Sequence, residues 1–428
     1  MYKIIKLSNG LPVIISPMRG TKTATVLFMA GTGSKYENRK NNGISHFIEH
    51  MMFKGTKKRP NALDISSELD GVGGEYNAFT DKEATGYWVK VESGKIELAL
   101  DVVSDMLLNS KFETKEINRE KGVIIEELNM YLDNPMIYVE DLFEELLYGN
   151  TPAGWDVIGS KNNINGFCRQ DFIKYFKSQY KTSNSVICIA GNVKPDIIKT
   201  VKKYFNKFET GKAGDKLDVC EQQDKPRVKA FYKKTDQAHI SLGVRSYQYR
   251  HKDMIALKLL GVILGGSMSS RLFIQLRERN GLAYYVRTTQ QSYTDTGYLT
   301  TRAGVPVGKT EKAIKIILSE YKKIAQNPIE QKELTRVKDY LIGRSALQFE
   351  ISDNITTWYA RQSILRLQQQ KKEKIVTPEN YYKEIKEIKA SDINRVARDI
   401  FTNQKLNLAI IGPYKNKIDF EKILKVVK

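Results

Sequence analysis

The stretch GISHFIEHMMFKGT, residues 43–56, holds two of the four histidines of this 428-residue chain. Its apolar residues recur at helical spacing, and Asn42 and Gly43 suit the start of a helix. His46 and His50 are four residues apart, so a helix places one above the other on the same face. Two imidazoles in this arrangement suit zinc, which peptidases commonly hold with two histidines and one carboxylate.

Glu49 follows His46 by three residues and precedes His50 directly. It therefore lies near the metal-binding face, where a carboxylate suits a general base that activates water. The pattern His-x-x-Glu-His is the inverted form of the better known zinc-peptidase motif. The alternative is a surface helix with two incidental histidines, which the scarcity of histidine in this chain disfavours.

A third ligand is expected from the predicted helix NREKGVIIEELNMYLDNP, residues 118–135. Glu120 and Glu127 lie seven residues apart, about two helical turns, and so share a face. Glu126 neighbours Glu127, and spacing alone does not choose between them. The alternative is an ordinary acidic, solvated helix.

Several separated segments resemble the pitrilysin/insulinase family of inverted zinc peptidases, which includes the mitochondrial processing peptidase. HFIEH is followed by a glutamate 127 − 50 = 77 residues later. GGEYNAFT at 73–80 and SSRLFIQLRERNGLAYYV at 269–286 match two further family motifs, in the same order. The resemblance covers nearly the whole chain.

The resemblance implies a zinc ion, Zn2+, held by His46, His50 and Glu127. It assigns Glu49 as the catalytic base and Glu120 as an outer group that steadies the site. No position of these motifs departs from the family pattern, so the resemblance implies an active member.

The segment at 73–80 has a physical interpretation of its own. Its glycines let another backbone approach closely, and the alternation from Tyr76 to Thr80 is typical of a strand. An exposed strand edge can bind a peptide as an added strand through main-chain hydrogen bonds, and the family uses an edge strand in this way. The alternative is a turn leading into the strand at 85–91. The substrate-binding residues expected here are Gly74, Asn77, Ala78 and Thr80.

Arg277 and Tyr284 lie seven residues apart across an expected helix-to-strand turn at Asn280 and Gly281. In the family this pair contacts substrate, and the tyrosine hydroxyl helps to stabilise the tetrahedral oxyanion. The resemblance therefore adds Tyr284 to Glu49 as a catalytic residue. Without the resemblance, the pair reads as an exposed arginine and a packing tyrosine.

The length of the chain predicts at least two domains. Residues 207–228 are polar and turn-rich, so we expect a catalytic zinc-binding domain at 1–212, a linker at 213–228 and a homologous domain at 229–428 that carries the Arg/Tyr motif. Corresponding strand–turn–helix units lie 238 − 24 = 214 and 412 − 191 = 221 residues apart. These similar offsets indicate a duplication, the alternative being a chance match of common units.

The expected fold class is α+β, with a mostly antiparallel sheet in each domain and helices packed on one side of it. The resemblance implies that the chain forms half of a clamshell. Strands are expected at 11–16, 23–30, 85–91, 185–190, 238–244, 297–304 and 406–411. Helices are expected at 44–54, 61–70, 95–109, 113–132, 138–147, 169–177, 195–206, 253–263, 270–279, 309–325, 330–349 and 391–401.

The partners implied are peptide substrates, either unfolded peptides or presequences, and a second chain that closes the chamber. This second chain is the partner in a homodimer, or in a heterodimer with a related subunit. Arg277 and Tyr284 would then serve the zinc of the partner. The alternative function is a non-catalytic scaffold or partner subunit, which a damaged zinc motif would favour.

The net charge of +20 raises the alternative of a nucleic-acid or membrane-surface binder, or of a cationic interior that attracts peptides. No compact basic tract interleaved with aromatic residues is present, so nucleic acid is not expected. No apolar run reaches the roughly 18 residues that span a bilayer, and no signal peptide is apparent, so we expect a cytoplasmic protein without a membrane partner. The three cysteines are interpreted as reduced.

Overall fold

A computed structural model describes residues 2–194, 196–369, 374–415 and 418–426. The chain forms two compact units, which we call the first and the second unit. The first comprises residues 1–129, 155–217 and 346–377, and the second comprises 130–154, 218–345 and 378–428. Each unit contains one sheet with its own helices, which confirms an α+β fold of two domains.

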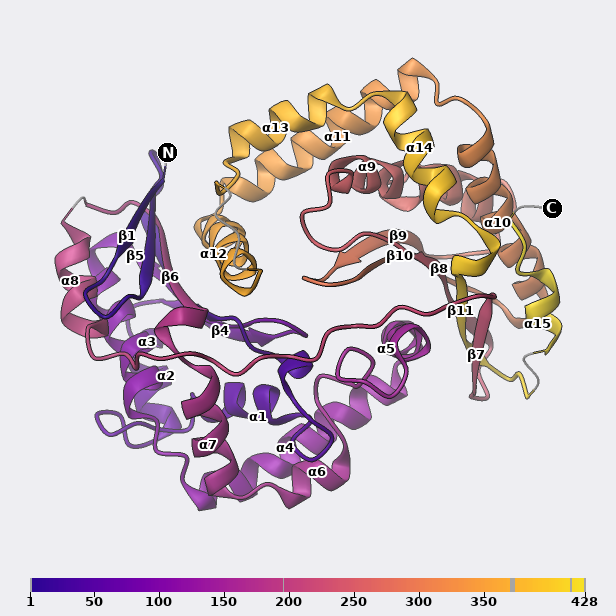
Figure 1. Ribbon diagram of the computed structural model, residues 1–428. Coiled ribbons are helices and arrows are strands. Elements are labelled where there is room, and N and C mark those ends of the chain that lie inside the picture. The colour runs from indigo at the N-terminus through magenta and orange to yellow at the C-terminus, as the bar shows by residue number, and fades with distance from the viewer. Residues whose placement is uncertain (1, 195, 370–373, 416–417, 427–428) are drawn as a thin grey trace. The chain divides into compact units, whose positions relative to one another are not determined.

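The sheet of the first unit has the strand order β1-β2-β6-β3-β5-β4 (Figure 1). All neighbours are antiparallel except β2 and β6, which are parallel. The mostly antiparallel sheet is therefore confirmed. The strands are β1 (Lys3–Lys6), β2 (Pro12–Pro17), β3 (Thr23–Ala30), β4 (Glu75–Thr80), β5 (Thr85–Glu92) and β6 (Ser185–Gly191).

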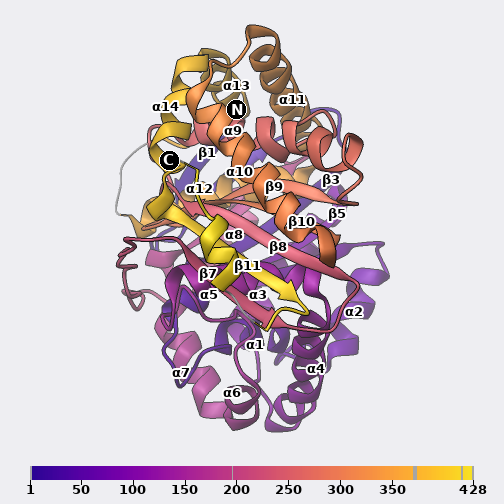
Figure 2. The same cartoon turned by 90° about the vertical axis from the view of Figure 1, so that its right-hand side faces the viewer.

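The sheet of the second unit has the order β7-β11-β8-β10-β9, in which only β7 and β11 are parallel (Figure 2). Without β1, the first sheet reads β2-β6-β3-β5-β4, which is the same connectivity with the parallel pair in the same place. The shared topology supports the duplication inferred from the offsets. The strands are β7 (Arg227–Tyr232), β8 (Gln237–Arg245), β9 (Val286–Ser292), β10 (Gly297–Pro306) and β11 (Leu406–Gly412).

The helices of the first unit include α1, which carries the histidine motif, and α4, which carries the glutamates. They are α1 (Ile44–Met51), α2 (Ala62–Asp70), α3 (Ile96–Asn109), α4 (Thr114–Asp133, whose last turn belongs to the second unit), α6 (Lys161–Gly166), α7 (Arg169–Gln179), α8 (Ile197–Phe205) and α12 (Ser352–Gln368). Residue 195, where the last of the first-half helices was expected to begin, lies outside the described residues.

The helices of the second unit are α5 (Pro135–Tyr148), α9 (Met254–Gly265), α10 (Thr310–Gln326), α11 (Gln331–Phe349, whose end belongs to the first unit), α13 (Pro378–Glu387), α14 (Ala390–Ile400) and α15 (Ile418–Ile423). In this unit, α5 packs on β11 and β8, α9 on β9 and α10 on β10. The helix expected at 270–279 is instead a π-helix over Phe273–Glu278.

Helices cover both faces of the first sheet, whereas one covered face was expected. Leu27 and Met29 of β3 pack with Tyr359 and Ile364 of α12. Phe28 points to the opposite face and contacts the ring of Phe208, and helix α3 also packs against β3 and β5. The continuous apolar run of β3 is typical of a strand buried on both sides, and the missing element was α12, whose mixed polar sequence showed no clear helical stripe.

The two units exchange a helix each, so the division of the chain differs from the continuous one expected at 1–212 and 229–428. Residues 130–154, with α5, belong to the second unit, and residues 346–377, with α12, belong to the first. The helices begin at residues 135 and 352, an offset of 352 − 135 = 217 that matches the repeat. Strand β7 also begins inside the segment expected as a linker.

Among the described residues, no helix is both long enough and apolar enough to span a bilayer.

Candidate metal centre

Helix α1 is anchored at its first turn by a buried carboxylate. The oxygens of Glu37 accept hydrogen bonds from the backbone N–H of Gly43 and of Ser45, each at 2.8 Å, and from the side chain of Asn42 at 3.0 Å. Gly43 has a φ of 99°, and a Cβ there would lie 2.3 Å from the carbonyl oxygen of Ile158. The start of α1 therefore requires glycine, and Glu37 supplies the acceptor that the helix N-terminus needs.

The two histidines of α1 face Glu127 of α4. Nε2 of His46 lies 3.6 Å from Oε2 of Glu127, and Nε2 of His50 lies 3.4 Å from the same oxygen. One ligand atom from each of the three residues lies within 4.8 Å of the other two. The structure thus brings together, from two helices, the donor set of two imidazoles and one carboxylate that zinc prefers.

The adjacent glutamates of α4 differ in the direction of their side chains. Glu126 is exposed and accepts a hydrogen bond from Asn129 at 3.4 Å. Glu127 is half-buried and turns toward α1. Only Glu127 joins the group of candidate ligands within the part of the chain that the structure describes.

Glu120 lies behind His50 and orients its ring. Nδ1 of His50 is 2.9 Å from Oε1 of Glu120, and Nζ of Lys54 is 2.7 Å from Oε2 of Glu120. Burial opposes protonation of His50, but the hydrogen bonds to Glu120 and Glu127 outweigh it and raise the pKa of His50 to about 9. An Nδ1–H donated to Glu120 leaves Nε2 as the atom that faces the other ligands.

His46 is buried and uncharged at neutral pH. Burial and the neighbouring His50 lower the pKa of His46 to about 4. Its Nδ1 has no hydrogen-bond partner among the described residues, while its Nε2 points to Glu127. A neutral imidazole beside a carboxylate is the form in which these groups bind a metal. His46 already has this form, and His50, whose pKa is raised to about 9, would release the proton on Nε2 as zinc binds, so the residues present fit a zinc ion.

Glu49 lies next to the candidate ligands without joining them. The hydroxyl of Thr80 donates a hydrogen bond of 2.6 Å to Oε2 of Glu49. Burial raises the pKa of Glu49, and the Thr80 hydrogen bond partly offsets this. A carboxylate with a raised pKa accepts a proton more readily than an ordinary carboxylate does, which suits a general base.

Strand β4 ends the first sheet and pairs with β5 on one side only within the described residues. The last residue of this strand is Thr80, so its hydrogen bond to Glu49 connects the sheet edge to α1. Asn77 is exposed, and its side chain accepts the backbone N–H of Ala78 at 2.8 Å. Gly74 precedes the strand, where its backbone donates to the carbonyl of Leu69. The expected edge strand therefore exists and lies beside the candidate metal ligands.

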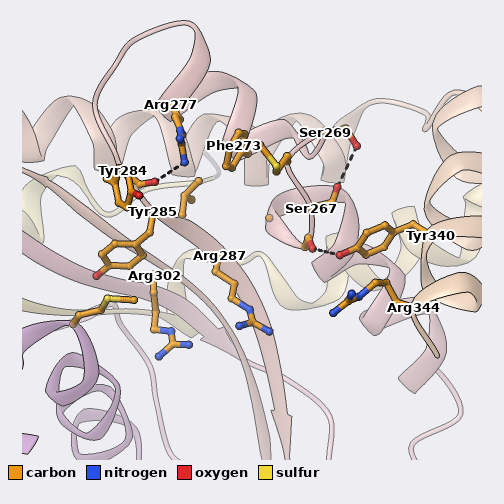
Figure 3. Close-up of a pocket in the computed structure, with 15 residues that line it drawn as sticks. Ser267, Ser269, Phe273, Arg277, Tyr284, Tyr285, Arg287, Arg302, Tyr340 and Arg344 are labelled. Carbon is orange, nitrogen blue, oxygen red and sulfur yellow. Dashed lines mark hydrogen bonds between the residues drawn. The ribbon is translucent and has the colours of Figure 1, made fainter. Parts of the chain in front are cut away.

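Arg277 and Tyr284 also lie together, but in the second unit (Figure 3). Nη1 of Arg277 donates to the backbone carbonyl of Tyr284 at 2.9 Å, and the guanidinium lies 5.1 Å from the centroid of the Tyr284 ring. The Tyr284 side chain is 79% exposed. The turn between them passes through Gly281 at a φ of 59°. The seven-residue spacing therefore does produce a contacting pair.

Sequence reasoning missed Glu37 and Lys54 as residues of this site. Lys54 follows His50 by four residues, a spacing that would place both on one face of a helix and could have pointed to Lys54. The helix ends before it, at Met51. Glu37 offered none, because it reaches α1 from outside any helix or strand and two of its hydrogen-bond partners are backbone N–H groups.

The chain matches known proteins along most of its length. Residues 13–161 match the family described as Insulinase (Peptidase family M16), and residues 167–341 match the one described as Peptidase M16 inactive domain. The "Uncharacterized zinc protease YmxG" of Bacillus subtilis is 32% identical over 416 residues, which cover 97% of this chain and 99% of that protein. The "Uncharacterized zinc protease SCO5738" of Streptomyces coelicolor is 32% identical over 422 residues, which cover 96% of this chain and 89% of that protein.

Solved structures share the fold. A protease from Helicobacter pylori superposes with a TM-score of 0.88 at 24% identity, covering 96% of this chain and 99% of that one. A chain of "Complex III2 from Candida albicans, Inz-5 bound" gives a TM-score of 0.84 at 16% identity, with 99% of each chain covered.

Proposed function

This chain belongs to the insulinase family of peptidases, M16, and on that basis we propose that it is a zinc metalloendopeptidase that hydrolyses extended, unfolded peptides or presequences. The observation that carries the proposal is the group of His46, His50 and Glu127 with Glu49 beside it. The four residues occupy the positions that a ligand set and its catalytic base require.

His46, His50 and Glu127 would hold the zinc ion. Bound there, zinc supplies a Lewis acid that polarises the scissile carbonyl and makes water more acidic. Glu120 keeps the Nδ1 proton of His50 engaged, so that Nε2 remains available as a ligand.

Glu49 moves the proton in the proposed reaction. Its carboxylate accepts a proton from the attacking water and returns it to the nitrogen of the leaving amine. The Thr80 hydroxyl holds one carboxylate oxygen, which fixes the orientation of the group. Tyr284, placed beside Arg277, would donate a hydrogen bond to the oxyanion that develops on the scissile carbonyl.

The edge of β4 that has no partner strand among the described residues is the reason for proposing an extended substrate. A peptide added beside residues 74–80 would use main-chain hydrogen bonds, which tolerate many sequences but require an unfolded segment. Thr80, the last residue of this strand, donates a hydrogen bond to Glu49, which supports a course in which an added peptide would run toward the proposed base and the candidate metal ligands.

The proposal extends to a second chain that completes the active site within an enclosed chamber. The candidate zinc ligands all belong to the first unit and Arg277 and Tyr284 to the second. In a two-fold dimer, each pair would serve the zinc of the other chain, giving two equivalent sites. A related subunit in a heterodimer would serve the same purpose.

The test combines metal analysis with cleavage of a fluorogenic, unstructured peptide. Glu49→Gln should keep its zinc and lose cleavage, whereas His50→Ala should lose both. Full zinc in the His50 variant would overturn the ligand assignment. Zinc bound by the wild type with no cleavage of any peptide in a diverse library would favour the non-catalytic role.

A second measurement addresses the requirement for an unfolded substrate. Native globular proteins and the peptides derived from them are incubated with the wild type, and the rates are compared. We expect cleavage of the peptides and sparing of the folded proteins. Similar rates for both would contradict the strand-addition and chamber proposals.

A further inference from the structure

The second unit contains a pocket of about 920 Å³ into which four arginines project (Figure 3). They are Arg277, Arg287, Arg302 and Arg344, and within the described part of the chain no aspartate or glutamate lines the pocket. Aromatic and methionine side chains, among them Phe273 and Met268, form much of the remaining wall, together with serines, glycines and a valine. A cationic pocket with apolar walls is suited to an organic anion rather than to a bare inorganic ion.

Two of these arginines lie directly opposite each other on adjacent strands. Arg287 of β9 and Arg302 of β10 are register partners in the antiparallel pair. Like charges placed opposite each other in a sheet are destabilising, so the pair needs a counter-charge. Glu140 of α5 provides one by forming an ion pair with Arg302. Glu140 also lies within electrostatic reach of Arg287, so one carboxylate serves two guanidinium groups.

The other three arginines differ in the contacts that their guanidinium groups make within the protein. Arg277 donates to the carbonyl of Tyr284 and stacks over the rings of Tyr284 and Phe273. Arg287 and Arg344 are exposed, and neither forms a hydrogen bond or a direct ion pair within the described residues, although Arg287 lies within electrostatic reach of Glu140. Arg344 comes from α11, so these two guanidinium groups reach the pocket from different elements.

We propose that this pocket binds a carboxylate of the extended peptide substrate through Arg287 and Arg344, so that the enzyme selects acidic peptides. The inference rests on the proposed peptidase function and specifies its substrate class. A guanidinium presents a planar set of donors that matches a carboxylate and pairs with it in bidentate fashion. The exposed Met268 and Tyr284 offer apolar surface to the neighbouring substrate side chains.

The overall charge of the chain favours the same substrates. A net charge of +20 attracts anionic peptides over a distance and repels cationic ones. Of the two substrate classes proposed above, it therefore favours acidic unfolded peptides over presequences, which are rich in arginine. The pocket adds a local attraction, because it brings four arginines together and only two of them have an ion pair among the described residues, Arg302 with Glu140 and Arg277 with Glu278. Both effects weaken as salt screens the charges.

The experiment measures binding without cleavage, by fluorescence anisotropy on zinc-loaded Glu49→Gln protein. The probes are labelled unstructured peptides that differ only in carrying glutamate or glutamine at internal positions, both with amidated C-termini. A third probe is the glutamine peptide with a free C-terminal carboxylate. We expect the glutamate peptide to bind more tightly than its amidated glutamine twin.

The arginine variants identify the pocket as the source of that preference. Arg287→Gln or Arg344→Gln should each reduce the glutamate-to-glutamine affinity ratio by about threefold, and the double variant by roughly tenfold, as expected for exposed ion pairs. Arg398→Gln is the matched control, since Arg398 is an exposed residue of α14 in the same unit that does not line the pocket. It removes the same charge and should keep the ratio.

The outcomes separate the pocket from the peptidase function itself. Equal binding of the two amidated peptides, with no arginine-dependent gain for the free C-terminus, would overturn the proposal. So would a preference that survives in the double variant. A gain seen only with the free C-terminus would support the pocket and identify a terminal carboxylate as its ligand. Wild-type cleavage of the glutamine peptide reports on the catalytic function in each case.

Discussion

Nδ1 of His50 lies 2.9 Å from Oε1 of Glu120, a residue that is only 3% exposed. The hydrogen bond fixes which ring nitrogen carries the proton and therefore which one faces the candidate ligand Glu127. The site thus depends on a residue that would not touch the metal.

Replacement of that carboxylate should weaken metal binding. Glu120→Gln keeps an acceptor for the Nδ1 proton but loses the charge, so we expect zinc affinity to fall by about tenfold or more. A competition titration against a chromogenic chelator measures this. Glu116→Gln, on the same helix and paired with Arg119 at the surface, is the control and should bind zinc as the wild type does. Equal affinity in both variants would exclude the orienting role of Glu120.

The two adjacent glutamates of α4 should respond differently to the same substitution. Glu127→Gln should markedly weaken zinc binding, because its Oε2 lies 3.6 and 3.4 Å from the two imidazole nitrogens. Glu126→Gln should retain zinc, because that side chain is exposed and outside the candidate ligand group. Metal content after dialysis distinguishes the two. The reverse pattern would assign the ligand to Glu126.

Loss of the Thr80 hydroxyl should slow the reaction without releasing metal. In Thr80→Val, Glu49 loses the 2.6 Å hydrogen bond that orients its carboxylate, and we expect kcat to fall by roughly tenfold, the scale of one hydrogen bond to a charged group. Thr80→Ser restores the hydroxyl and should recover most of the rate. A valine variant as active as the serine variant would show that the hydrogen bond is dispensable.

The anchor of α1 should contribute to stability. Glu37→Gln directs an amide NH2 toward at least one of the backbone N–H donors at Gly43 and Ser45, which leaves a buried donor without an acceptor. We expect the free energy of unfolding to fall by about 1–3 kcal/mol, measured by urea denaturation of the metal-free protein. Glu97→Gln, whose side chain is 58% exposed, should change it by much less. Equal effects would remove the special role of Glu37.

A shared active site should allow two inactive variants to complement each other. Glu49→Gln and Tyr284→Phe proteins are mixed in equal amounts and allowed to exchange subunits. Random pairing makes half the dimers mixed, and each mixed dimer has one intact site of two, so about a quarter of wild-type activity should return.

The complementation control is each variant incubated alone under the same exchange conditions. No recovery, despite exchange demonstrated by differently labelled subunits, would mean that Tyr284 acts on the zinc of its own chain or does not act.

Local geometry explains why much of the site was readable from the residues alone. His46, Glu49 and His50 lie within five consecutive residues, and the helical repeat fixes their relative positions before any tertiary contact forms. Strand β3 was predicted at its observed bounds because its apolar run is unbroken and short. The family motifs were equally local, and the family and the α+β fold class are confirmed.

Long-range packing determined the rest, because contacts between distant segments leave no periodic signal in the chain. The selection of Glu127 over its neighbour depends on how α4 is rotated against α1. Helix α5 belongs to the second unit and α12 to the first because each packs on the apolar surface of that unit's sheet. These surfaces form only when the sheets have assembled. The opposition of Arg287 and Arg302 follows from the register of β9 and β10, where a shift by one residue would turn one of the two side chains to the other face.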